Sequence, residues 1–395
     1  MCLRRVGVVP LTVNINVSAI EQDETFVEAI LPHTSRIVHL SLTGYRFIED
    51  ISNVIPTFFT STMDDLISLE LQQSSESTEL FPSGVSPAFP ISWNVSKLTS
   101  LHLTQTPLYP AIASVTSLVD LKLDEYTAPF RFSELIAFLR ANPNLQSIVL
   151  DVEFDRSELP QPGRVALPRL RRLSLTCADP LDAKVLISSI SLPRGISLEV
   201  ASSTNWCTTL RSFLPSPPTP IQKILKPIVT IKYQHNPSMV QFYGNDSGFS
   251  FQRAPGDFTP YPELSLFAVS TVRELHLKNF CLSDQSPLLS RLPALETLVL
   301  VNFTALTSFA FLTAEPVLCP FLKTIAFLNC RLDRWVVREL EMAVVRRRDS
   351  AAVWLDKIVI VGQTGYLPDH DLVLQLRSSV PCVDVRMDDR LPDLS

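Results

Sequence analysis

The stretch LPALETLVL, residues 292–300, contains the pattern that decides the fold: apolar, two variable, apolar, one variable, apolar. Nine other hexamers repeat it. The ten copies are IVHLSL (37–42), LISLEL (66–71), LTSLHL (98–103), LVDLKL (118–123), LQSIVL (145–150), LRRLSL (170–175), VRELHL (272–277), LETLVL (295–300), LKTIAF (322–327) and LDKIVI (355–360). They form two blocks, and copies within a block start between 20 residues (98 to 118) and 33 residues (322 to 355) apart. Most of these spacings are typical of leucine-rich repeats, with insertions in the longer units.

Each hexamer is predicted to be a short strand, because its apolar residues alternate with period two. Parallel strands of this kind stack about 4.8 Å apart, and the rest of each repeat returns along the outer face. We therefore expect an α/β fold: a leucine-rich-repeat solenoid, or horseshoe, with a curved parallel sheet and irregular helical returns.

Several return segments are predicted to be helices. One begins with Ser133 as its N-cap and stops at Asn142, ahead of a proline, and another begins at Asp182. The longest starts at Asp333 and closes with the arginines 346–348. Those arginines are explained either as cations at a helix C-terminus or as a contact site.

The hexamer spacing fails between the two blocks. Weaker strand patterns lie at 196–200 (ISLEV) and 228–233 (IVTIKY), and the proline-rich 214–220 and the aromatic 241–258 indicate an insertion. Residues 244–248 (GNDSG) have the composition of a hairpin turn between aromatic runs. The insertion is either a binding loop or a tolerated surface excursion.

The whole chain, 1–395, is interpreted as one irregular solenoid. Its parts are an N-terminal capping strand and helix (1–34), a first repeat block (35–200), the insertion (201–265), and a second repeat block with a C-terminal cap (266–395). The alternating stretches at 11–17 and 383–387 are the candidate end strands.

Composition favours a folded protein and argues against several function classes. Hydrophobic residues make up 46% of the chain and the mean hydropathy is +0.20. The net charge is −6 with scattered basic residues, so we expect no nucleic-acid partner. Only 10 glycines are present, and no nucleotide-binding, zinc-protease or serine-hydrolase motif occurs. We therefore expect no catalysis and no cofactor.

The cysteines and the N-terminal residues indicate in which cellular compartment the protein is expected. The seven cysteines are widely spaced without a C-x-x-C pair, which indicates buried, reduced thiols in a cytoplasmic or nuclear protein. Residues 1–17 only faintly resemble a secretory signal, because Pro10 and two asparagines interrupt the apolar run. No window is long and apolar enough to span a membrane, so no membrane association is expected.

Three histidines, His39, His102 and His276, occupy the same outward slot of three hexamers. Since other repeats separate them, they cannot share one site, and we interpret them as exposed polar residues of the strands. The remaining three, His33, His235 and His370, lack ligand-spaced partners, so no metal site is predicted.

The outward slots are polar in the first block and become apolar in the last three hexamers. A large exposed apolar patch usually marks an interface, so we predict that this part of the concave face binds a partner protein. The candidate residues are Glu274, His276, Lys278, Val299, Val301, Ala326, Leu328, Val359 and Val361. The alternative is that the tail 381–395 or the insertion 241–260 covers them.

The start of the chain carries a family resemblance. PLTVNINV (10–17), then a predicted helix and LPHTSRIVHLSL (31–42), resembles the region after the F-box in fungal F-box/leucine-rich-repeat proteins, and the later LPxLxxLxL units are similar. In that family the F-box binds the Skp-type adaptor of a cullin ubiquitin ligase and the repeats present a substrate. The resemblance implies a protein-binding module of ubiquitin-dependent turnover. No F-box is visible here, so adaptor binding is not expected; the alternative is a structural or regulatory repeat protein without a ligase link.

Overall fold

The computed structural model describes the chain in segments. They are residues 9–16, 29–44, 63–73, 96–105, 114–124, 130–151, 153–155, 164–203, 210–216, 228–234, 238–244, 247–253, 266–267, 269–279, 286–303, 309–313, 318–350, 354–362 and 367–387. The chain divides into two compact units, Met1–Leu198 and Glu199–Ser395.

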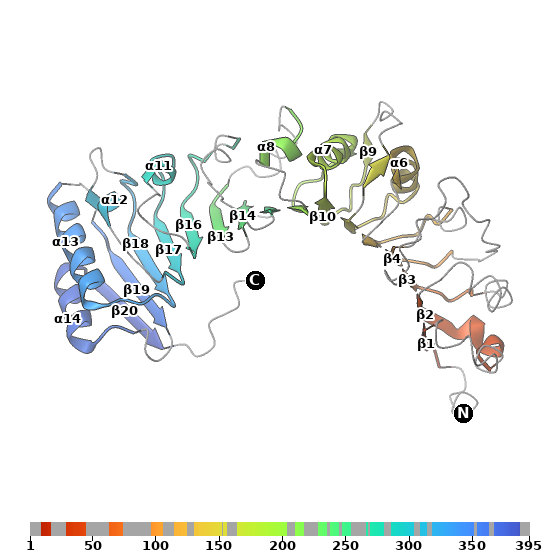
Figure 1. Ribbon diagram of the computed structural model, residues 1–395, viewed down its shortest axis with the longest axis horizontal. Coiled ribbons are helices and arrows are strands. Elements are labelled where there is room, and N and C mark those ends of the chain that lie inside the picture. The colour runs from red at the N-terminus through yellow and green to blue at the C-terminus, as the bar shows by residue number, and fades with distance from the viewer. Residues whose placement is uncertain are drawn as a thin grey trace. The chain divides into compact units, whose positions relative to one another are not determined.

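A large, mostly parallel sheet of 16 strands is the main element (Figure 1), with the order β1-β2-β3-β4-β5-β7-β10-β12-β15-β14-β13-β16-β17-β18-β19-β20. All ten hexamers lie in strands of this sheet, and every pair of sequence-adjacent hexamer strands within a block is parallel. The protein is therefore an α/β protein built on a repeated parallel strand.

The first unit contains the strands β1 (Leu11–Asn16), β2 (Ile37–Gly44), β3 (Ser68–Gln73), β4 (Ser100–Thr104), β5 (Asp120–Asp124), β7 (Ser147–Asp151), β10 (Arg172–Cys177) and the start of β12 (Ser197–Ser202). Its helices are η2 (Leu31–Arg36), α6 (Phe132–Ala141) and α7 (Pro180–Ser189). Short strands pair separately: β6 (Phe130–Arg131) with β8 (Phe154–Asp155), and β9 (Val165–Ala166) with β11 (Ile190–Ser191). The predicted first strand is thus confirmed as β1, although the helix expected after it falls largely on residues outside the described ranges.

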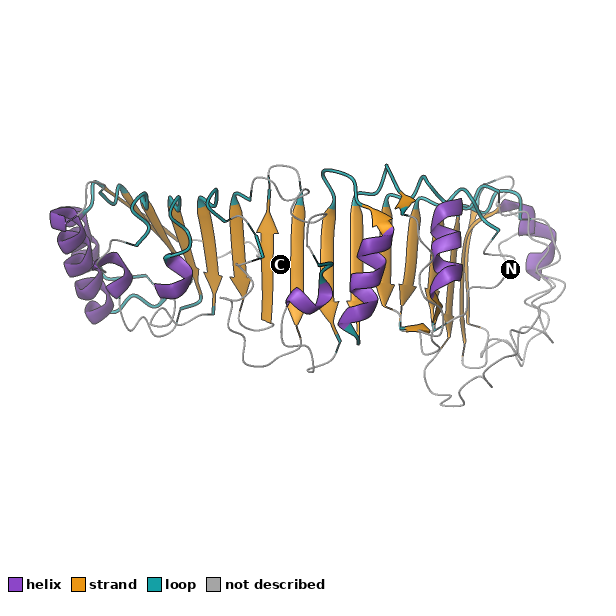
Figure 2. Cartoon of the chain, turned by 90° about the horizontal axis from the view of Figure 1, so that it is seen from above, coloured by secondary structure: helices purple, strands orange, loops and turns teal. Residues whose placement is uncertain are grey.

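The second unit contains β13 (Thr230–Gln234), β14 (Ser238–Tyr243), β15 (Gly248–Arg253), β16 (Glu274–Lys278), β17 (Thr297–Val301), β18 (Thr324–Leu328), β19 (Lys357–Gly362) and β20 (Cys382–Met387). Its helices are α8 (Leu210–Phe213), α11 (Ser286–Leu289), α12 (Ala310–Thr313), α13 (Arg334–Ser350) and α14 (His370–Ser379). Figure 2 shows that the described helices of each unit lie over its strands as a separate layer. The strand expected at the C-terminal end is confirmed as β20.

The inward side chains of each hexamer form the core. In the repeat of β17, for example, Leu295, Leu298 and Leu300 have no exposed surface. Because side chains of one strand point alternately to the two faces, the residues between them stand on the opposite face of the sheet. The alternation that predicted the strands therefore also positions the candidate site.

The insertion is not the loop that the sequence suggested. Strands β14 and β15 form an antiparallel hairpin, β14 pairs antiparallel with β13, and β13 pairs parallel with β16. The hairpin turn predicted at 244–248 is confirmed. The aromatic residues that resembled a surface excursion are buried instead, with Phe242, Phe249 and Phe251 at 0–2% exposure.

Two predicted helix starts need correction. Helix α6 begins at Phe132 with Arg131 in the N-cap position, so Ser133 is not the cap. Helix α7 begins at Pro180, and its N-cap is Asp179, whose carboxylate accepts a hydrogen bond from the Leu181 amide. The start of α13 was predicted within one residue: the helix begins at Arg334, and the carboxylate of Asp333 accepts a hydrogen bond from the Val336 amide at 2.9 Å.

The basic end of α13 has a role that neither sequence interpretation included. Arg347 is only 1% exposed, and its guanidinium donates to the main-chain oxygens of Leu318 (3.3 Å) and Cys319 (2.8 Å). Burial lowers the pKa of Arg347. This arginine joins the helix to the turn that leads into β18, while Arg346 and Arg348 are exposed.

Candidate functional site

The sheet face of the first unit is polar along rows that cross neighbouring strands. Parallel register places the outward residues of β2 to β10 side by side. The central row is Ser41, Glu70, His102, Lys122, Val149 and Ser174, and all six side chains are partly exposed. The backbone geometry therefore brings side chains from six repeats onto one surface, and five of the six are polar.

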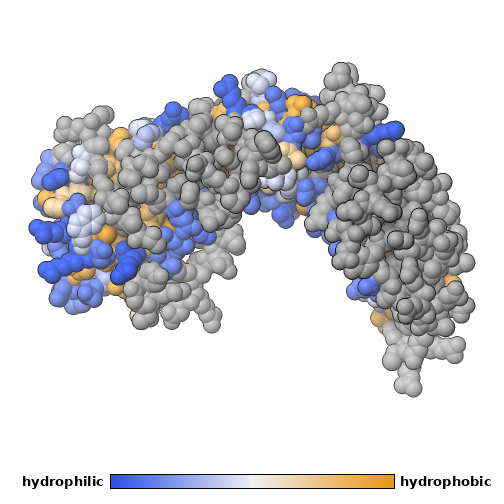
Figure 3. Space-filling view, in the orientation of Figure 1, coloured by the Kyte–Doolittle hydropathy of each residue, from blue (hydrophilic) through white to orange (hydrophobic). Residues whose placement is uncertain are grey.

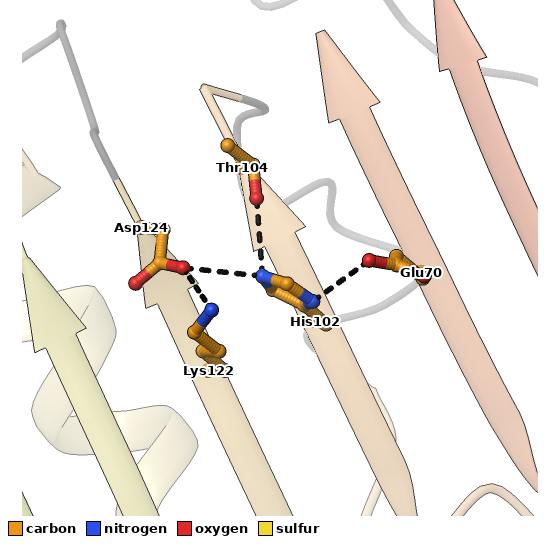
Figure 4. A network of polar contacts seen from close by, with 5 residues as sticks. All are labelled: Glu70, His102, Thr104, Lys122 and Asp124. Atoms are coloured by element: carbon orange, nitrogen blue, oxygen red, sulfur yellow. Dashed lines mark hydrogen bonds and ion pairs between the residues drawn. The ribbon is translucent and has the colours of Figure 1, made fainter.

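A charged network lies at the centre of this face (Figure 4). The Nδ1 atom of His102 lies 3.0 Å from Oε1 of Glu70, and its Nε2 atom lies 3.3 Å from Oδ2 of Asp124. The hydroxyl of Thr104 is 3.1 Å from the same Nε2 atom, and Lys122 forms an ion pair with Asp124. Three adjacent strands, β3, β4 and β5, thus hold one imidazole between two carboxylates.

Sequence reasoning missed this network although it noted His102. We interpreted the histidine as a lone polar residue, whereas Glu70 and Lys122 flank it in register and Asp124 lies one row further along. The signal was present, since charged residues occupy matching slots of three consecutive hexamers. A comparison across repeats, row by row, would have found it.

The predicted partner-binding residues of the second unit do lie together. In register, His276 faces Val299, Val299 faces Ala326 and Ala326 faces Val359. The next row places Lys278, Val301, Leu328 and Val361 side by side. The sequence therefore identified one contiguous surface across β16 to β19.

That surface is less exposed than the sequence suggested. Val299, Val301 and Ala326 are 5%, 7% and 8% exposed and form a buried cluster, against which Leu328 and Val359 pack. Val361 is partly exposed. The expectation of an open apolar patch is thus wrong for the three most central residues. The two segments proposed as a cover end in residues outside the described ranges, 388–395 and 254–260.

Polar contacts fix the β16 side of this surface. The Nε2 atom of His276 donates to Oε1 of Glu274 at 2.9 Å, and the hydroxyl of Thr230 donates to Oε2 at 3.2 Å. The hydrogen bond from His276 is the main reason that the pKa of Glu274 lies below its usual value. The Nδ1 atom of His276 is buried without a partner among the described residues.

The inserted hairpin adds side chains beside this position. Lys232 of β13 lies in register with both His276 and Gln241, and its ammonium sits 5.1 Å from the ring centre of Tyr243. The Tyr243 hydroxyl donates to Gln241 at 3.0 Å. Burial raises the pKa of Tyr243, with a smaller contribution from Glu199. The insertion therefore extends the polar part of the face.

A second charged group bounds the surface at β20. Asp384 lies 2.6 Å from Nη2 of Arg386 and 3.4 Å from Nζ of Lys357. The Arg386 hydrogen bond is the main cause that lowers the pKa of Asp384, and Asp384 in turn raises the pKa of Arg386. The apolar rows are thus enclosed by charged residues on both sides.

The three histidines of the shared slot do not meet. His39 is exposed, whereas His102 and His276 each contact carboxylates in different units. Within the described ranges, no three His, Cys, Asp or Glu residues are grouped to hold a metal ion. Nor is any described helix long and apolar enough to cross a membrane.

The cysteine prediction is partly confirmed. Cys177, Cys319 and Cys330 are buried free thiols, and burial raises their pKa values to about 12, 12 and 11. Cys382, on β20, is exposed instead. The other three cysteines lie outside the described part of the chain: Cys2, Cys207 and Cys281.

Hydrophobic residues on the visible surface are scattered. Figure 3 shows mostly hydrophilic colour over the described residues, with separate hydrophobic positions among it. The sheet faces are therefore the best organised candidate surfaces.

Comparison with known proteins adds no family: no family model matches the chain. No curated protein matches it either.

Proposed function

We propose that this protein is a non-enzymatic protein-binding module, a leucine-rich-repeat solenoid of horseshoe type whose sheet face holds a segment of a partner. The observation that carries the proposal is the in-register face of the first unit. There, six repeats present partly exposed side chains while the alternate residues are buried. Stacked repeats commonly use such extended surfaces for binding.

The charged network strengthens the choice of this face. Glu70, His102, Lys122 and Asp124 already hold one another, so little side-chain freedom is lost when a partner binds. The second unit offers a further contact through the candidate residues Glu274 to Val361. Its buried valines support the shape of the face. The partly exposed candidates that can touch a partner include Glu274, Lys278, Leu328, Val359 and Val361.

The biological setting follows from resemblance alone. The similarity to fungal F-box/leucine-rich-repeat proteins supports a role in presenting a substrate for ubiquitin-dependent turnover in the cytoplasm or nucleus. The alternative is a structural or regulatory repeat protein with no ligase link. Recovery of a Skp-type adaptor with the purified chain separates the two.

Affinity purification with mass spectrometry tests the binding face. We would compare wild type with the double charge reversal Glu70→Arg, Lys122→Glu. The matched control is Arg140→Glu on the exposed side of α6. Specific loss of a protein from the double variant, with retention by the control, supports the face. An unchanged protein set in a double variant that folds normally contradicts it.

The second unit is tested at an exposed position of the candidate surface and not at its buried centre. Val299→Asp would place a charge in the buried cluster and disturb folding. Val361→Asp, on a partly exposed side chain, is the better probe, with Leu374→Asp on the exposed side of α14 as control.

A further inference from the structure

We propose that His102 makes the sheet face of the first unit proton-responsive. Proton uptake at its Nε2 atom exchanges Thr104 for Asp124 as the hydrogen-bond partner, and it adds one positive charge to the face. The inference builds on the proposed function, because it concerns the charge that this face shows to a partner.

The Nδ1 side of the ring is the same in both states. Its neighbour at 3.0 Å is a carboxylate oxygen of Glu70, which only accepts hydrogen bonds. Nδ1 therefore keeps its proton in the neutral and in the charged ring. This selects the Nδ1–H tautomer for neutral His102.

The Nε2 side has two alternative partners. Without a proton, Nε2 is an acceptor, and the Thr104 hydroxyl at 3.1 Å can donate to it, whereas Asp124 cannot. With a proton, Nε2 becomes a donor and bonds the Asp124 carboxylate at 3.3 Å. Both forms of the ring are therefore hydrogen-bonded on both sides, and the two states differ in partner rather than in fold.

The remaining charged groups set the consequence. Glu70 of β3 and Asp124 of β5 carry one negative charge each, and Lys122 of β5 carries one positive charge. The network therefore has a net charge of −1 when His102 is neutral and 0 when it is charged. Asp120, one row away on β5, is exposed and faces the same side.

The ring can exchange protons with water, because the His102 side chain is 26% exposed. Histidine is the side chain that ordinarily changes charge between about pH 5 and pH 8. A cationic partner segment is thus attracted more strongly to this face when His102 is neutral than when it is charged. A proton bound to His102 of β4 therefore changes the net charge of a network that is formed by β3, β4 and β5.

Nitrogen NMR of the full chain with ¹⁵N-labelled histidine tests this without any partner. The His102 signals are assigned from a His102→Asn sample. Across a pH titration we expect the neutral ring to carry its proton on Nδ1 alone and the charged ring to be protonated at both nitrogens. A neutral ring protonated on Nε2 alone would overturn the proposal, as would a ring that keeps one charge over the whole pH range in which the protein stays folded.

Variants of the hydroxyl complete the test. Thr104→Val removes the donor, so Nε2 of the neutral ring loses its hydrogen bond, and the charged ring, which bonds Asp124, should persist to higher pH than in the wild type. Thr104→Ser keeps the hydroxyl and should behave as the wild type. An unchanged pH dependence of the Nε2 signal in Thr104→Val overturns the exchange. Since these readings are made on the free protein, they fail or succeed independently of the pull-down that tests the binding face.

Discussion

Asn329 donates a hydrogen bond from Nδ2 to Oδ1 of Asn302 over 2.9 Å. The two residues follow β18 and β17, and both have the left-handed backbone, with φ of 52° and 55°. The Asn329 amide donates to the main-chain oxygen of Val361, the second-last residue of β19, and the Asn302 amide donates to that of Leu328, the last residue of β18. Asparagine tolerates this conformation better than most residues. The pair thus joins three consecutive repeats at the ends of their strands.

We expect Asn302→Val to lower the free energy of unfolding of the second unit by about 1–3 kcal/mol, since a β-branched residue is strained at positive φ and the side-chain acceptor is lost. Asn302→Gly relieves the strain and should cost less. Urea unfolding followed by hydrogen exchange of second-unit peptides measures both. Equal effects of the two variants would contradict the backbone argument.

Asn142 links two repeats of the first unit. Its side chain is fully buried, accepts from the Leu118 amide and donates to the main-chain oxygens of Val115 and Phe138. Asn142→Leu leaves these groups buried without partners and should cost about 3 kcal/mol or more. The control Asn144→Leu, at an exposed position, should stay within about 0.5 kcal/mol of wild type by urea denaturation.

Arg347 is predicted to be structural and an exposed arginine of the same helix dispensable. Arg347→Met removes two hydrogen bonds from a charged donor to main-chain oxygens, so we expect a loss of about 2–4 kcal/mol. Arg338→Met, on the exposed side of α13, should change stability by less than about 0.5 kcal/mol. Similar losses for both variants would show that the arginines of α13 act through their charge alone.

Thiol reactivity should divide the cysteines by burial. At pH 8 the buried Cys177, Cys319 and Cys330 remain protonated, because their pKa values are about 12, 12 and 11. We expect iodoacetamide to label Cys382 within minutes and these three only after denaturation. Mass spectrometry of each cysteine peptide gives the rates. Rapid labelling of Cys330 in the folded protein would refute its burial.

Glu274 should contribute to stability in a pH-dependent manner. Its pKa is lowered in the folded protein, so its contribution is present above the unfolded value, about 4.3, and is lost as the pH falls through the folded value. The stability difference between wild type and Glu274→Gln should therefore shrink on acidification. Urea unfolding from pH 7 to pH 3 measures it, with Glu134→Gln on the exposed side of α6 as control. A difference independent of pH would contradict the assignment.

The repeat was visible in the sequence because it depends on local alternation. Period-two apolar residues specify which face of a strand is buried, so LETLVL and its nine relatives were sufficient to predict parallel strands and to align Val299 with Val359. The same logic predicted the strand at 228–233 and the turn at 244–248, but it did not place residues 238–253 in the sheet. A hairpin of two antiparallel strands satisfies the backbone hydrogen bonds of the neighbouring strand as well as a parallel repeat would. No local sequence pattern distinguishes such a hairpin from a surface loop.

Alternation by itself determined the strands, their buried faces and the rows of outward residues. Only the tertiary structure decided what those rows contain: a histidine held between Glu70 and Asp124, an arginine buried against Cys319, and valines that shield one another. These outcomes depend on distances between residues far apart in the chain. A repeat pattern fixes which residues face the same way, whereas burial and pairing depend on which neighbours come within contact distance once the strands are stacked.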